Sequence, residues 1–96
     1  KTSFLFQEMF DYPGFKATII GVNTKYLTDE WLGFTISSET AKDFLSRTRH
    51  IDPLGENGEF HTIVVESPLY SSTFKIKPLE RITEKDSTYL RITLSE

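Results

Sequence analysis

The stretch Phe15-Lys16-Ala17-Thr18-Ile19-Ile20-Gly21-Val22 predicts a β-strand at the centre of a sheet. β-Branched residues occupy both of its faces, and its length suits a strand that is buried on at least one side. A second strand is predicted over residues 60–66, where an Ile-Val-Val run favours an interior position in a sheet. A β-sheet is therefore the expected framework of the fold.

Three helical segments are predicted around these strands. Leu5, Phe6, Met9 and Phe10 have the i, i+4 spacing of a short amphipathic helix that ends at Pro13-Gly14, and Met9 and the aromatic residues are expected in the core. Residues 28–33 can close one helical turn. The lone Trp31 is expected in the core, with a position at an interface as the alternative. Residues 38–48 predict a further helix, because Ser37 or Ser38 can cap it and basic residues gather at its end.

The C-terminal part of the chain predicts a β-hairpin. Apolar residues alternate with polar ones around residues 74–76 and 90–94, and Glu84-Lys85-Asp86-Ser87 fits a four-residue loop between the two strands. Pro78 cannot donate a ladder hydrogen bond, so the segment 73–83 should be an edge strand or be bent there. The expected fold class is α+β: a small mixed sheet with two or three helices and a C-terminal β-hairpin.

Length and composition limit the possible functions. The 96 residues suit a single domain, and a net charge of -3 gives no basic field for nucleic acid. Without cysteine the chain has no disulfide, thiolate nucleophile or Cys-type zinc site, which suits a cytoplasmic location. No apolar run approaches the length of a membrane span, so we expect no membrane partner. Because the chain begins at Lys1 rather than Met, we expect a piece of a longer protein.

The loop that precedes the strand 60–66 concentrates the side chains that binding or catalysis would use. Its three carboxylates and one imidazole could hold a hard cation or serve as acid and base. Asn57-Gly58 is also a strong turn dipeptide, so the acidic residues could simply be solvated around a turn. The candidate residues are Asp52, Gly55, Glu56, Asn57, Gly58, Glu59, His61 and Thr62. Calcium-loop spacing, phosphate-binding glycine motifs and G-x-S-x-G do not occur.

The same loop resembles a known family. Residues 52–62, Asp-Pro-Leu-Gly-Glu-Asn-Gly-Glu-Phe-His-Thr, are similar to the D-P-C-G-E-N-G-E-[FY]-H-T segment in the C-terminal half of the diphthine–ammonia ligase family. Upstream, residues 14–22 are similar to the family's G-F-x-A-x-I-x-x-V strand, and Leu32-Gly33 matches part of its L-G-R motif. Leu54 stands where the family has Cys, and Phe34 stands in place of the Arg.

The resemblance implies one half of an enzyme. Family members are similar to the PP-loop ATP pyrophosphatases, whose N-terminal domain binds ATP and Mg²⁺ through an S-G-G-x-D-S loop and activates a substrate carboxylate as an adenylate for attack by ammonia. No such loop occurs in these residues. We therefore expect the substrate-binding C-terminal half of an ATP-dependent ligase, with its partners an N-terminal PP-loop domain, a carboxylate and ammonia. Alone, it is not expected to be active or to bind ATP and Mg²⁺.

The resemblance also suggests roles for the loop residues. Glu56, Glu59 and His61 would be catalytic, and a metal site is left open. The residues expected to bind substrate are Asp52, Gly55, Asn57, Gly58 and Thr62. The substrate could be diphthine, the precursor of diphthamide on elongation factor, or another carboxylate. The alternative function is a non-catalytic protein-binding or homo-oligomerisation domain that uses the predicted edge strand 73–83.

Overall fold

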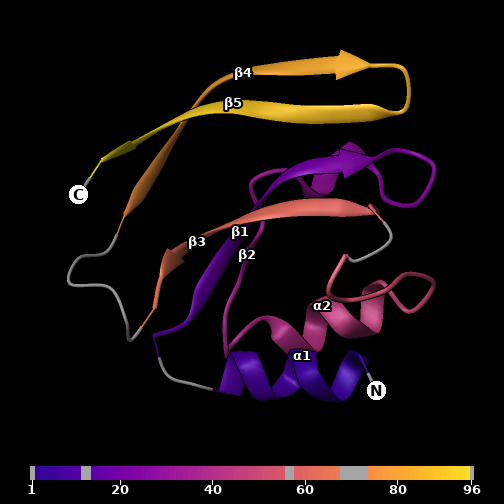
Figure 1. Cartoon of the computed structure of the whole chain (residues 1–96), viewed down its shortest axis with the longest axis vertical. Helices are drawn as coiled ribbons and strands as arrows, with labels where there is room; N and C mark the ends of the chain where they lie inside the picture. The colour runs from indigo at the N-terminus through magenta and orange to yellow at the C-terminus, as the bar shows by residue number, and fades with distance from the viewer. Residues whose placement is uncertain (1, 12–13, 56–57, 68–73, 96) are drawn as a thin grey trace.

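The computed structural model describes residues 2–11, 14–55, 58–67 and 74–95 (Figure 1). Within these residues the chain forms two α-helices, one 3-10 turn and five strands. Their order is α1 (Thr2–Asp11), β1 (Lys16–Asn23), η1 (Asp29–Trp31), β2 (Thr35–Ile36), α2 (Ala41–Arg47), β3 (Phe60–Glu66), β4 (Lys75–Glu84) and β5 (Ser87–Ser95). The predicted α+β class and C-terminal hairpin are confirmed, and β3 has the predicted bounds.

β1 is the central strand, as the sequence predicts. β3 pairs along most of its length, from Lys16 to Val22. β2 pairs with Ala17 and Thr18, whereas β5 pairs with residues 21–23, so β2 and β5 share the second edge of β1. Every described pair is antiparallel, where the sequence predicts a mixed sheet. Antiparallel neighbours need no crossover connection between them, which suits a chain this short.

The hairpin of β4 and β5 lies on the far side of the molecule from the helices (Figure 1). Its loop is shorter than predicted, because Glu84 and Ser87 pair in the ladder and leave only Lys85 and Asp86 between the strands. The predicted edge position and bend of β4 are confirmed, since β4 ends the strand order and its register shifts between Pro78 and Glu80. The proline therefore marks the bend, as expected for a residue without an N–H group.

An aromatic cluster fills the space between the sheet and the two helices. Phe44 of α2 is fully buried and its ring lies 5.4 to 6.1 Å from those of Phe6, Trp31, Phe34 and Phe60. The predicted core position of Trp31 is confirmed. That of Met9 is wrong, because this side chain is 41% exposed. Phe6 and Phe10 lie one helical turn apart on the face of α1 that packs into the core. Met9 lies at the margin of this apolar face.

α2 is shorter than the predicted helix 38–48, and Thr40, not Ser37 or Ser38, is its N-cap residue. The Thr40 hydroxyl donates to the Thr35 carbonyl and accepts from the Ser37 N–H, each across 2.9 Å. These bonds hold residues 37–40 in a turn ahead of the helix, so regular helix begins only at Ala41. Among the described residues, no helix has the length and apolar character that a membrane span requires.

Candidate functional site

The loop between α2 and β3 is built from successive turns that begin at Asp52. The Asp52 side chain accepts the Leu54 N–H across 3.0 Å, and its carbonyl accepts the Gly55 N–H across 2.9 Å. The Gly58 N–H then donates to the Gly55 carbonyl across 3.1 Å. Asp52 thus serves the loop as an Asx-type turn residue, which is a common use of a short carboxylate side chain. Glu56 and Asn57, two of the predicted site residues, lie outside the described residues.

Glu59 joins the two ends of this loop. Its side chain is 4% exposed, and its Oε2 accepts the Asp52 N–H across 2.9 Å. Its carbonyl accepts the Asn23 N–H across 2.9 Å, which ties the loop to the end of β1. A buried carboxylate needs such donors because it has lost the hydrogen bonds of water. Glu59 therefore positions the loop backbone, whatever further role it has.

The two described glycines of the loop differ in their surroundings. Both have positive φ, +67° at Gly55 and +79° at Gly58. A Cβ at Gly55 would lie 2.9 Å from the Phe60 carbonyl oxygen and 3.2 Å from the Phe60 ring, whereas a Cβ at Gly58 would meet nothing within 4 Å. The close backbone approach at Gly55 is thus to Phe60 of the same chain. The Gly58 backbone faces a more open region.

The next two predicted site residues, His61 and Thr62 of β3, lie on opposite faces of the sheet. Thr62 pairs with Ile19 and lines a small apolar cavity on the side of the helices, together with Phe6 and Phe10. His61 is exposed and lines a hollow on the other side of the sheet. Because β3 begins at Phe60, strand alternation does not place Glu59 and His61 on a common face. No group of three or more His, Asp or Glu among the described residues could hold a metal ion.

The hollow beside His61 has a volume of about 360 Å³ and a glycine in its floor. Gly21 of β1 pairs with His61 of β3 on one side and with Tyr89 of β5 on the other. A Cβ at Gly21 would lie 3.4 Å from His61 Cδ2 and 3.6 Å from Tyr89 Cβ, so the missing side chain leaves the floor open between these two residues. The other lining residues are Ile20, Val22, Asn23, Gly58, Glu84, Ser87, Thr88 and Leu90.

Tyr89 and Glu84 give this hollow its polar wall. The Tyr89 hydroxyl donates to Glu84 Oε1 across 3.4 Å. Partial burial and then the nearby Glu84 carboxylate raise the pKa of the Tyr89 phenol above its usual range. The phenol is therefore neutral and able to donate near neutral pH. An imidazole, a phenol and a carboxylate thus surround a space large enough for a small polar ligand.

Sequence reasoning finds only part of this arrangement. His61 is predicted from the loop motif, but Gly21, Tyr89 and Glu84 are not predicted as site residues. A glycine inside a strand pattern is itself a signal of close approach by another group, and this signal applies to Gly21. Tyr89 and Glu84 carry no comparable signal, because only the register of β5 on β1 and β4 brings them to the hollow.

Comparison with known proteins connects this site to a family. The family described as the diphthamide synthase C-terminal domain matches residues 1–95. The match includes the whole loop and all four strands that line the hollow, and it extends beyond the stretch in which the sequence motifs are seen. No curated protein matches the chain in sequence.

Proposed function

Because the chain belongs to the diphthamide synthase C-terminal domain family, we propose that it is the substrate-binding part of an ATP-dependent amide-forming ligase. One observation carries the proposal: within the family match, the fold places the motif residue His61 over the hollow at Gly21. The hollow offers a site for the substrate, and the imidazole offers a group that can exchange protons at its edge.

The proposed reaction divides between two domains. An N-terminal PP-loop domain would bind ATP and Mg²⁺ and join the substrate carboxylate to AMP, with release of pyrophosphate. Ammonia would then attack the acyl carbon, the amide bond would form, and AMP would leave. The carboxylate of diphthine is the substrate that the family suggests. The present chain would hold the body of that substrate so that its carboxylate reaches the nucleotide.

Each described residue has a task in this scheme. His61, as a neutral imidazole, would take the proton that the attacking nitrogen loses. Tyr89 would donate a hydrogen bond to the substrate or keep Glu84 in place, and the open floor at Gly21 would admit the substrate. Asp52 and Glu59 would hold the loop in shape through their backbone contacts. Gly55 and Gly58 supply the positive φ angles of the loop. The roles of Glu56 and Asn57 follow from the motif alone.

The two histidines of the chain allow a matched test. In the complete protein, His61→Gln should lower the rate of AMP release about 100-fold with diphthine-bearing elongation factor and ammonium as substrates. His50→Gln is the control, because the His50 ring bonds to the Tyr26 carbonyl across 2.7 Å and does not line the hollow. ATP binding should be unchanged in both variants. Full turnover of His61→Gln would contradict the assigned proton-transfer role.

The alternative, a protein-binding domain that pairs through β4, has less support. β4 is an edge strand, and Leu79 on it is 48% exposed. However, Pro78, the adjacent register shift and the charged residues along β4 are features that prevent pairing between sheet edges. The outer edge of β4 therefore disfavours pairing with a strand of another protein.

A further inference from the structure

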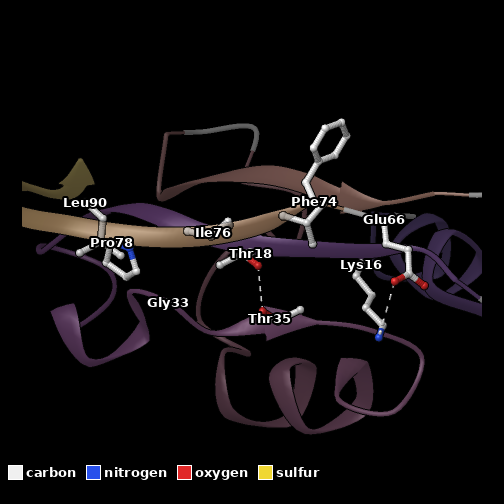
Figure 2. A pocket seen from close by; sticks show the side chains of 10 residues that line it. Lys16, Thr18, Gly33, Thr35, Glu66, Phe74, Ile76, Pro78 and Leu90 are labelled. Carbon is white, nitrogen blue, oxygen red and sulfur yellow. Dashed lines mark hydrogen bonds and ion pairs between the residues drawn. The ribbon is translucent and has the colours of Figure 1, made fainter. Parts of the chain in front are cut away.

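Another cavity, of about 390 Å³, lies near the start of β1 (Figure 2). It forms because β2 and β5 share one edge of β1: β5 pairs only with residues 21–23, and β2 takes the same edge at Ala17 and Thr18. The hairpin thus departs from β1 and leaves a space over β2. Volumes of this size are typical of sites for small molecules.

One wall of this cavity is apolar. Ile76, Pro78 and Leu90 of the hairpin face the cavity, and Val65 and Phe74 complete its apolar lining. When an apolar group covers apolar side chains that face water, the free energy of the system falls. This wall therefore favours a ligand with an apolar side chain.

The floor and the opposite side of the cavity are polar. The Thr18 and Thr35 hydroxyls are hydrogen-bonded across 2.8 Å, which uses one of their two hydrogens and leaves the other for donation. Lys16 Nζ and Glu66 Oε1 lie 3.9 Å apart, with side chains 42% and 28% exposed. Figure 2 shows this pair on one side of the two threonines and Pro78 with Leu90 on the other.

We propose that this cavity binds a free α-amino acid with an apolar side chain. The ligand carboxylate would meet Lys16 and a threonine hydroxyl, and its ammonium group would meet Glu66. Its side chain would then lie against Ile76, Pro78 and Leu90. An α-amino acid carries opposite charges on one carbon, which matches a cation and an anion that lie side by side at 3.9 Å. This site is separate from the proposed ligase reaction and needs no nucleotide.

The test is an NMR titration of the isotope-labelled protein with L-leucine. The amide signals of Thr18, Thr35 and Ile76 should shift saturably with a dissociation constant of about 1 mM or tighter. N-acetyl-leucine lacks the ammonium charge, leucine amide lacks the carboxylate, and glycine lacks the side chain. Each should bind about tenfold more weakly. Equal binding of any of these three, or no saturable shift with leucine, would overturn the proposal.

Variants provide a second measurement. Lys16→Gln and Glu66→Gln should each weaken leucine binding about tenfold, whereas Lys42→Gln on the exposed face of α2 should not change it. Unaltered leucine affinity in both cavity variants would also overturn the proposal. Because the titration measures binding without ATP, its outcome is independent of whether the complete protein forms an amide.

Discussion

The Glu59 carboxylate accepts the backbone N–H of Asp52 across 2.9 Å, and this bond closes the loop that carries the family motif. The acceptor lies immediately before β3, and the donor lies at the start of the motif. A side chain that the motif suggests as catalytic is therefore also a structural link between the two ends of the loop. An activity measurement alone cannot separate these two roles, whereas stability measurements can.

Glu59→Ala should lower the free energy of unfolding by about 2 kcal/mol, because the part-buried Asp52 N–H loses its carboxylate acceptor. Glu59→Gln keeps an acceptor oxygen and should cost less than about 1 kcal/mol. Urea denaturation measures both values, and hydrogen exchange at the Asp52 amide should speed up only in Glu59→Ala. If both variants were as stable as the natural protein, the link would have no structural importance.

Gly55→Ala and Gly58→Ala separate crowding from backbone strain. Gly55→Ala should destabilise the protein by about 3 kcal/mol, because its methyl group meets the Phe60 carbonyl at 2.9 Å in addition to the positive φ. Gly58→Ala keeps only the positive φ and should cost about 1 kcal/mol. Chemical denaturation of the two variants side by side tests the difference. An equal decrease in the free energy of unfolding of both variants would show that Phe60 moves to accommodate the added methyl group.

The residues of β1 and β3 made much of the fold predictable. Their apolar, β-branched runs specify buried strands, and Pro78 specifies a bend because it lacks an N–H group. The lengths of α2 and of the hairpin loop could not be predicted. They depend on the Thr40 hydroxyl and on the pairing of Glu84 with Ser87, which only the folded chain brings about.

The candidate site was predictable only where a local motif marks it. His61 and the loop around it follow from adjacent residues, as does the turn that Asp52 begins. Tyr89 reaches the hollow because β5 pairs with β1 in a register that sets it opposite Gly21. That register joins residues far apart in the chain, and no local pattern specifies it.

The Tyr89 phenol gives a prediction about pH. Its pKa in the folded protein is raised, so the unfolded chain loses the phenol proton first as the pH rises. The contribution of Tyr89 to stability is therefore complete below about pH 10 and is lost as the pH rises through the folded pKa. Unfolding free energies of the natural protein and of Tyr89→Phe, measured from about pH 8 to pH 11, should converge or cross at the alkaline end. Parallel curves would contradict the raised pKa.

Gly21→Ala tests the hollow without disturbing the fold. Its methyl group would lie 3.4 to 3.6 Å from His61 and Tyr89, which is ordinary contact. Gly21 adjoins a register shift between β1 and β3, but it does not have the positive φ that favours glycine. The variant should therefore be as stable as the natural protein or more stable by up to about 1 kcal/mol. In the complete protein the methyl group would occupy the floor of the substrate site, so KM should rise about tenfold. Gly33→Ala is the control, since its positive φ of +88° should lower stability while KM stays constant. An unchanged KM in a folded Gly21→Ala protein would place the substrate elsewhere, because a ligand held in the hollow between His61 and Tyr89 would meet the added methyl group.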